Sequence, residues 1–204
     1  MSIREETKMI RNAIEYIRLL LRHKWVVFKL CCKVGIPWRG IIHDLSKFGP
    51  TEFFERVRIH EEDKISEFTV CKKQKEYLRS RLHHISKNKH HMEYWIDFRT
   101  EQFAIPVPYK YVVEMACDKM AANIVYNEKK WTNESQYEYW MEEKEISIIN
   151  PKTENFLTEV FKQVKEQGID KTYTKENFKT LYKKYYIEDK NNYIYEHNGK
   201  WAIK

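Results

Sequence analysis

A chain of 204 residues, of which 42% are hydrophobic and 33% charged, is long enough for one domain with a real core and too apolar for a disordered protein. It holds only 5 glycines and 5 prolines, which disfavours a sandwich or barrel with many tight turns, and no apolar run reaches the roughly 18 residues of a membrane span. The net charge of +7 is interspersed with acidic residues, so a solvated surface that attracts phosphorylated substrates is favoured over a nucleic-acid-binding face.

The N-terminal half of the chain predicts long helices with short connections. Apolar residues such as Ile10, Ile14 and Ile17 recur at helical spacing. Gly35 and Pro37 follow, and these residue types commonly end one helix and begin the next. The helices expected here cover residues 5–34, 38–45, 50–59 and 68–87, with a polar stretch near 60–67.

Residues 88–98 allow two interpretations. The preceding helix continues through them, or the chain bends at Lys87-Asn88-Lys89. Pro106 and Pro108 then introduce a helix over 108–127, which is apolar on nearly every side. Such a helix belongs in the middle of a domain.

The end of the chain combines charged helices with one hairpin. Helices are expected near 134–144, 152–167 and 174–186. Alternating residues around Asn198-Gly199 give the strongest short-range signal for a β-hairpin. The expected fold class is therefore all-α, with a helical bundle over residues 1–150 and an accessory segment, residues 151–204, whose helices and hairpin pack on that core.

A set of histidines and aspartates carries the predicted chemistry. His43-Asp44 stands at the end of a predicted short helix, where both side chains can turn toward one cation. His23 lies in register with apolar residues, and Asp118 lies within the most apolar helix, where a carboxylate is costly unless it is paired or bound to metal. We expect these four residues to bind a divalent metal ion. The alternatives are an N-capping Asp beside a surface His, and a solvent-facing stripe that carries Asp118.

Four of the 8 histidines fall between residues 83 and 91. On a continuous helix His84, Asn88 and His91 share one face, whereas a bend at Asn88 turns His90 inward. Because neutral imidazoles are good ligands, His84, His90 and His91 are predicted to bind a second metal ion or to orient a phosphate. The alternative is a basic, solvent-facing loop that contacts polyanions.

Candidate catalytic residues lie near these ligands in the sequence. Lys47 follows Asp44 by three residues and is placed to contact a substrate phosphate, and Glu52 is placed to act as a general base or as the partner of a ligand. Asn88 and Glu114 complete the catalytic set, and Asp44 is counted in both sets. Such N and O donors suit Mn, Fe, Co, Ni or Zn and suit Mg less well, so the predicted cofactor is one or two of these divalent metal ions.

The pattern of His23, His43-Asp44 and Asp118 resembles the signature of the HD-domain superfamily of metal-dependent phosphohydrolases. Over roughly residues 10–160, three strings are also similar to a family of bacteria and their viruses that is known only as a domain of unknown function. The strings are Ile41-Ile42-His43-Asp44-Leu45-Ser46-Lys47-Phe48, Asn88-Lys89-His90-His91 and Glu114-Met115-Ala116-Cys117-Asp118. The resemblance implies an HD-domain-like helical core, one or two metals, and hydrolysis of phosphate esters in nucleotides.

The expected function is therefore that of a phosphohydrolase or phosphodiesterase whose substrate is a phosphorylated small molecule, above all a nucleotide or a cyclic or signalling nucleotide. Two alternatives stay open. One is a protein that binds a nucleotide or nucleic acid without turnover, and the other is a di-iron oxygenase on the same scaffold.

The N-terminus, the cysteines and several aromatic residues bear on where the protein is located and how it assembles. A charged N-terminus without an apolar signal segment favours the cytoplasm, and no membrane partner is expected. Reduced thiols are expected for Cys31, Cys32, Cys71 and Cys117. Surface positions that would support a homodimer are expected for Trp131, Tyr137, Tyr139 and Trp140.

Overall fold

The structure of the chain, a computed structural model, describes residues 3–59, 75–97, 104–195 and 201–203. In this described part the regular structure is helical, apart from one two-stranded hairpin and an isolated bridge between Ile96 and Ala104. The all-α class is therefore confirmed. None of the described helices combines the length and the apolar character that crossing a membrane requires.

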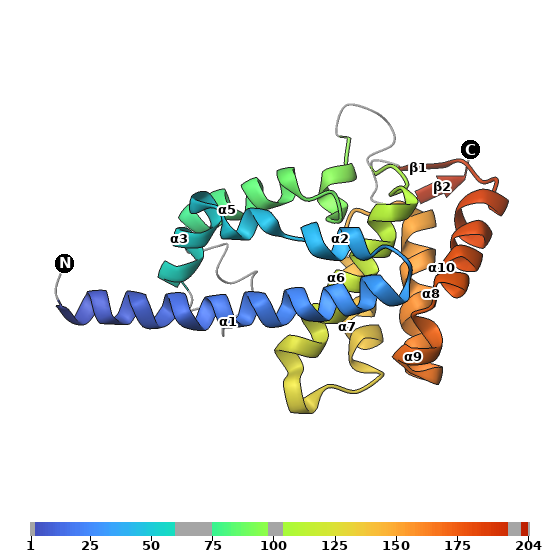
Figure 1. Ribbon diagram of the computed structural model, residues 1–204. Helices are drawn as coiled ribbons and strands as arrows, with labels where there is room; N and C mark the ends of the chain where they lie inside the picture. Colours follow the sequence, from blue (N-terminus) through green and yellow to red (C-terminus); the bar gives the residue numbers. More distant parts are fainter. Residues whose placement is uncertain (1–2, 60–74, 98–103, 196–200, 204) are drawn as a thin grey trace.

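The elements keep the labels of Figure 1. In chain order they are α1 (Ile3–Lys33), α2 (Pro37–Ile42), η1 (Leu45–Phe48), α3 (Pro50–Ile59), α5 (Lys75–Lys87), η2 (Met92–Trp95), α6 (Tyr109–Asn127), η3 (Glu128–Lys130), α7 (Ser135–Glu145), α8 (Pro151–Gln167), α9 (Ile169–Thr172), α10 (Lys175–Tyr182), η4 (Lys183–Glu188), β1 (Tyr193–Tyr195) and β2 (Trp201–Ile203). The first three η elements are 3-10 helices, and η4 is a π-helix.

Most of the expected helices are present with nearly the expected bounds, but three differ. The short helix predicted over 38–45 stops at Ile42, because His43 has a non-helical ψ of 129° and Asp44 adopts a left-handed conformation, neither of which continues a helix. The helix predicted over 174–186 changes from α-helical to π-helical after Tyr182. The helix predicted over 68–87 is described from Lys75 onward, and its expected first turns and the polar stretch before them lie outside the described residues.

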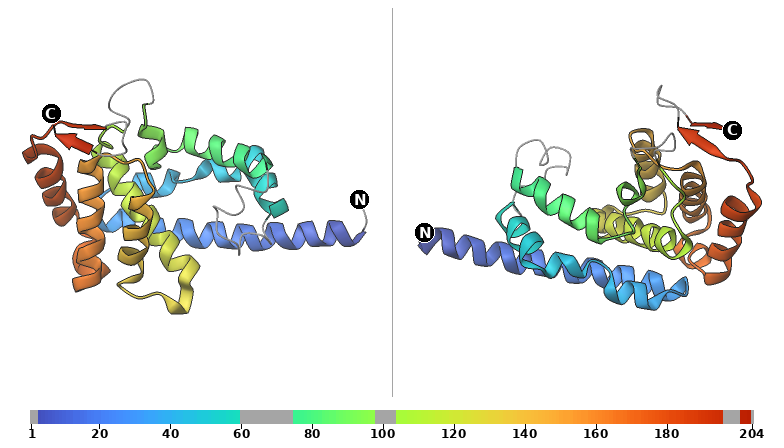
Figure 2. Two further views of the ribbon diagram at one scale, coloured as in Figure 1. Left: turned by 180° about the vertical axis from the view of Figure 1, so that it is seen from behind. Right: turned by 90° about the horizontal axis from the view of Figure 1, so that it is seen from above.

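Helix α1 runs along one side of the molecule and packs against α2 and α6, as Figures 1 and 2 show. Its inward face buries Val27, Leu30 and Cys31. Gly40 permits the close approach of α2, because a Cβ atom at this position would lie 2.8 Å from the Cα atom of Phe28. This contact fixes the end of α2, where the His-Asp pair follows.

The largest hydrophobic cluster joins α1 and α6 to the C-terminal helices. It contains Met115 of α6, Phe156 of α8 and Phe178 of α10, none of which exposes more than 1% of its surface. The core is thus continuous across residue 150, where the sequence suggested the start of an accessory segment. That division into two units stays a prediction.

The expectation that Trp140 lies on the surface is wrong. This residue is fully buried, its ring centroid lies 5.8 Å from that of Phe161, and its Nε1 donates a 2.8 Å hydrogen bond to Thr158. Trp131 and Tyr137 pack partly against the core, and only Tyr139, at 55% exposure, is clearly on the surface. The homodimer stays a prediction.

The hairpin and the thiols complete the fold. Strands β1 and β2 pair antiparallel, with Ile194 opposite Ala202, and the predicted turn at Asn198-Gly199 lies outside the described residues. The described cysteines are free: Cys31 and Cys117 are buried and Cys32 is exposed, while Cys71 lies outside the described residues.

Candidate metal centre

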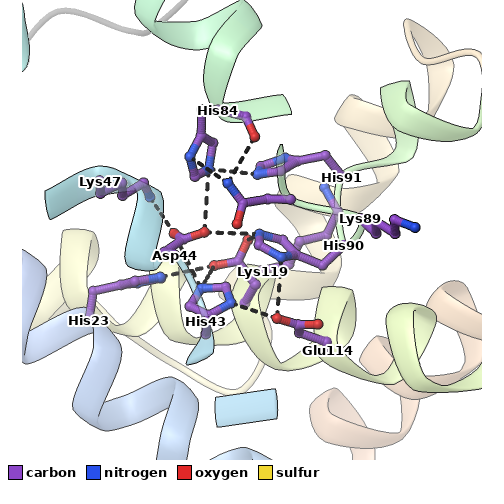
Figure 3. A network of polar contacts seen from close by, with 12 residues as sticks. His23, His43, Asp44, Lys47, His84, Lys89, His90, His91, Glu114 and Lys119 are labelled. Carbon is purple, nitrogen blue, oxygen red and sulfur yellow. Dashed lines mark hydrogen bonds and ion pairs between the residues drawn. The ribbon is translucent and has the colours of Figure 1, made fainter. Parts of the chain in front are cut away.

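The centre begins where α2 ends. His43 leaves the helix with φ −53° and ψ 129°, and Asp44 follows with φ 53° and ψ 28°. A left-handed conformation is uncommon for residues other than glycine and clusters at functional sites. Lys24 of α1 donates 2.6 Å hydrogen bonds to the carbonyl oxygens of Ile41 and His43, and so holds this turn against α1. The His43 and Asp44 side chains consequently point into one polar cluster (Figure 3).

A first group of four donors comes from α1, the end of α2 and α6. Its members are His23, His43, Asp44 and Asp118. Oδ1 of Asp118 lies 2.9 Å from Nε2 of His23 and 3.2 Å from Nε2 of His43. One ligand atom from each of the four residues lies within 4.8 Å of the others. The Asp118 side chain is 19% exposed and is the most accessible of the group.

A second group of four donors contains Asp44 again, together with His84, His90 and His91. Helix α5 ends at Lys87 and the chain bends directly after it, which turns His90 inward to 1% exposure. Nε2 of His84 and Nε2 of His91 lie 2.9 Å apart. A continuous helix would have placed His84 and His91 on one face, and a bend would have turned His90 inward. The chain bends, and all three histidines nevertheless lie in the same cluster.

Asp44 is shared by the two groups through its two carboxylate oxygens. Oδ2 lies 3.3 Å from Nε2 of His43, whereas Oδ1 lies 3.3 Å from Nε2 of His90 and 3.4 Å from Nε2 of His84. Ligand atoms bound about 2.0–2.1 Å from one ion at right-angled or tetrahedral positions are about 3 Å apart. The spacing of these donors is therefore the spacing of neighbouring metal ligands.

Glu114 lies behind the histidines and is fully buried. Its Oε1 is 3.1 Å from Nδ1 of His43 and 3.3 Å from Nδ1 of His90. Arg39 of α2 donates from Nε to Oε2 of the same carboxylate at 2.6 Å. A ligand histidine commonly donates its second ring N–H to a carboxylate, which fixes the tautomer and leaves the other nitrogen for the metal.

On the other side of the cluster, the carboxylate of Glu52 of α3 contacts histidine Nδ1 atoms in the same way. It is 1% exposed, and its oxygens lie 2.8 Å from Nδ1 of His84 and 2.7 Å from Nδ1 of His83. Asn88 donates to the hydroxyl of Ser46 at 2.8 Å and to the carbonyl oxygen of His84 at the same distance. Glu52 and Asn88 thus lie around His84 and belong to neither of the two donor groups.

Lys47 is the cation of the cluster. Its Nζ lies 2.6 Å from Oδ2 of Asp44, and its side chain is 20% exposed. Burial lowers its pKa, but the nearby carboxylates of Asp44 and Asp118 outweigh burial and raise the pKa above the usual lysine value. The ammonium group therefore stays charged beside the donor atoms.

Opposite charges tune the protonation of the donors. Burial lowers the pKa of His43, but the carboxylates of Asp44 and Asp118 raise it well above the usual histidine value. Desolvation raises the pKa of Asp44, but His43 and Lys47 hold it well below the usual range. His91 differs, because burial and the neighbouring His90 both lower its pKa.

The donors present fit a divalent transition-metal ion, which confirms that the cluster could hold a metal while leaving its identity open. Five imidazoles and three carboxylates meet here, because Glu114 forms a third group of possible ligands with His43 and His90. Nε2 of His43, Nε2 of His90 and Oδ1 of Asp44 are buried and make no hydrogen bond within the part of the chain that the structure describes. Buried polar atoms are normally satisfied, and an ion at their centre would satisfy all three.

The structure brings together every ligand that the sequence suggested. All seven belong to the two donor groups: His23, His43, Asp44, His84, His90, His91 and Asp118. His83 belongs to neither of these groups. Among the predicted catalytic residues, Lys47 lies at the donors, whereas Glu52, Asn88 and Glu114 contact ligand histidines from behind. Sequence reasoning missed Arg39 and Ser46, and no spacing or composition signal marks either one.

In the comparisons with known proteins, the chain matches one protein family. A model described as "Family of unknown function (DUF5662)" matches residues 12–163, a span that includes every residue of the two donor groups. No curated protein and no solved structure shows a significant match to the chain. The relation to the HD-domain superfamily stays a prediction. Because the matched span is well over half of the 204 residues, the chain belongs to the DUF5662 family.

Proposed function

We propose that the chain is a metal-dependent hydrolase of phosphate esters of the HD-domain type, whose substrate is a nucleotide or a cyclic or signalling nucleotide. The observation that carries the proposal is the pair of four-donor groups that share Asp44. A shared carboxylate suits two neighbouring ions, and in enzymes that cleave phosphate esters with two metals the ions are about 3.5–4 Å apart.

The two ions would be held by different histidines. His23, His43, Asp44 and Asp118 would hold one, and Asp44, His84, His90 and His91 the other. When bound, such ions polarise a phosphoryl oxygen and lower the pKa of a water molecule toward neutrality. The protein would supply fixed rings, because Glu114 and Glu52 accept from the Nδ1 atoms of the ligand histidines.

Lys47 would recognise the substrate. Its charged Nζ lies beside Asp44, the residue common to both donor groups, and part of its side chain reaches solvent. An ammonium group in this position would neutralise negative charge on a phosphoryl group that binds next to Asp44. The net charge of +7 would also favour the approach of anionic substrates.

Metal content and turnover of generic esters test the proposal. The purified chain would be analysed for metal per chain, and then loaded with Mn(II), Fe(II), Co(II) or Zn(II). Hydrolysis of p-nitrophenyl phosphate and bis-p-nitrophenyl phosphate would be followed before a nucleotide panel. The matched variant is Asp44→Asn, because asparagine also tolerates the left-handed backbone conformation of this position.

We expect metal-dependent release of p-nitrophenol or phosphate that EDTA and Asp44→Asn abolish. A wild-type chain that holds no metal after reconstitution would contradict the proposal and favour a binding protein without turnover. Bound iron with O2 consumption and no ester hydrolysis would support the oxygenase alternative instead.

A further inference from the structure

A single carboxylate oxygen contacts one ligand histidine from each donor group. Oε1 of Glu114 is 3.1 Å from Nδ1 of His43, which belongs to the first group. The same oxygen is 3.3 Å from Nδ1 of His90, which belongs to the second group and not to the first. Figure 3 shows Glu114 on the side of these two rings away from Asp44. The two donor groups are therefore joined twice, by Asp44 between them and by Glu114 behind them.

Arg39 decides which oxygen of Glu114 the histidines use. Its Nε donates to Oε2 at 2.6 Å, and its Nη2 also contacts Oε2, so Oε1 is left for the two rings. The guanidinium carbon lies 5.0 Å from the ring centroid of Tyr111, a stacking contact that an arginine makes and a lysine does not reproduce. Arg39 is thus a fixed partner of Glu114.

The backbone also fixes Arg39. The next residue is Gly40, where a Cβ atom would lie 2.8 Å from Cα of Phe28 and 3.0 Å from Cβ of Cys31. Helix α2 consequently lies directly on α1, with Arg39 directed at Glu114 of α6. A buried carboxylate without such a partner would be strongly destabilised.

We propose that Arg39 and Glu114 form a positioning pair that couples the two metal sites, so that a change at Glu114 weakens both ions together. This inference rests on the proposed two-metal function. Oε1 of Glu114 forms a hydrogen bond with Nδ1 of His43 and an ion-pair contact with Nδ1 of His90, and its negative charge favours a proton on each Nδ1, which leaves the lone pair on each Nε2. Arg39 offers no metal ligand, and Glu114 lies outside the two four-donor groups and shares a third group of possible ligands with His43 and His90.

Glu52 provides the matched control. It is also buried and also accepts from a ligand histidine, but its ligand contact is with His84 of the second group alone. Glu114→Gln and Glu52→Gln make the same chemical change at equivalent distances behind the ligands. The first should act on two ions and the second on one.

The experiment is a calorimetric titration of the metal-free full chain with Zn(II) and with Mn(II). We expect two equivalents in the wild type. Glu114→Gln should weaken both binding events by about 10- to 100-fold, the usual effect of removing such a partner, whereas Glu52→Gln should weaken one event only. Arg39→Gln should act like Glu114→Gln, and Arg39→Lys should restore only part of the affinity because it cannot donate as a fork.

A second readout does not depend on affinity. In the zinc-loaded protein, 15N shifts of the imidazoles report which nitrogen carries the proton. Glu114→Gln should change the Nδ1 signals of His43 and His90, and Glu52→Gln should change that of His84. If Glu114→Gln does not fold, Arg39→Gln and Arg39→Lys replace it in the comparison with Glu52→Gln.

The outcomes separate the two proposals. Two equivalents bound by both the wild type and Glu114→Gln with equal affinity would refute the coupling and leave the proposed function standing. Loss of a single ion in Glu114→Gln would refute the coupling as well. A wild-type chain that takes up no metal would overturn both proposals.

Discussion

Tyr173 donates a 2.9 Å hydrogen bond to the backbone carbonyl oxygen of Ala116, 57 residues earlier in the chain. Both residues are buried, and Ala116 stands two positions before the donor Asp118 on α6. The ring of Tyr173 also packs against Phe178, with centroids 5.1 Å apart. The C-terminal helices are thereby tied to the helix that carries Asp118.

Replacing Tyr173 with phenylalanine should lower the stability of the chain without changing its donors. The variant keeps the ring and loses one hydrogen bond, so the free energy of unfolding should fall by about 0.5–1.5 kcal/mol in urea titrations. Removing the neighbouring ring with Phe178→Ala should cost about 3–5 kcal/mol, because it also leaves a cavity. If Tyr173→Phe unfolds at the same urea concentration as the wild type, the bond to Ala116 contributes nothing.

Replacing Asp44 should remove more metal than replacing Asp118. Asp44 belongs to both donor groups and Asp118 to one, so Asp44→Asn should lose both ions while Asp118→Asn keeps the second. Both variants remove one negative charge and little volume. A difference in metal content between them therefore reports whether the Asp44 carboxylate binds both ions. Metal per chain would be measured by elemental analysis after desalting. One ion retained at full affinity in Asp44→Asn would show that its carboxylate is not shared.

The metal-free protein should become less stable as the pH rises above 6.5. The pKa of His43 is raised by Asp44 and Asp118 despite burial, so the folded chain holds this proton to a higher pH than the unfolded chain. That stabilisation is complete below pH 6.5 and is lost as the pH rises through the folded pKa. His90 also has a raised pKa and adds to this slope, whereas His23 and His91, whose pKa values are lowered, are neutral in both states once the pH is well above 6.5.

The metal-loaded protein should show the opposite slope over the same range. An ion must displace the proton of His43, so affinity for the ion, and with it the stability of the folded state, rises with pH. Melting temperatures recorded upward from pH 6.5, in EDTA and in excess Mn(II), check both signs. A metal-free chain that gains stability with pH would mean that His43 is already neutral.

The elements that the sequence predicted well are those with strong periodicity and clear breakers. The helices expected over 5–34 and 108–127 appear as Ile3–Lys33 and Tyr109–Asn127, since each combines an apolar pattern with Gly or Pro at an end. Trp140 was misplaced because its helix is polar on most sides, and a lone aromatic there gives no periodic signal.

The grouping of the candidate ligands was predictable for a different reason. A His-Asp pair, an inward His and a carboxylate in an apolar helix are each costly to bury, so their coincidence indicates a common partner. The sharing of Asp44 and the contact between Arg39 and Glu114 were not predictable. They depend on the left-handed turn at Asp44 and on the close packing at Gly40, and both are tertiary properties.

Removing the Lys47 ammonium should reduce turnover while the metal stays bound. Lys47 touches Asp44 through an ion pair but belongs to neither donor group, so Lys47→Ala should keep two ions per chain. The loss of one positive group beside a reacting phosphoryl group should lower kcat/KM for bis-p-nitrophenyl phosphate by about 100-fold.

The control for Lys47 is Lys89→Ala, which removes the same group from a residue next to His90. The Lys89 ammonium points away from the donors (Figure 3) and lies 5.3 Å from the ring centroid of Tyr94, so its removal should leave kcat/KM nearly unchanged. Equal losses in the two variants would indicate a general effect of net charge. A Lys47→Ala chain that loses its metal instead would show that the ammonium group holds Asp44 in place, and its role as a phosphate contact would be rejected.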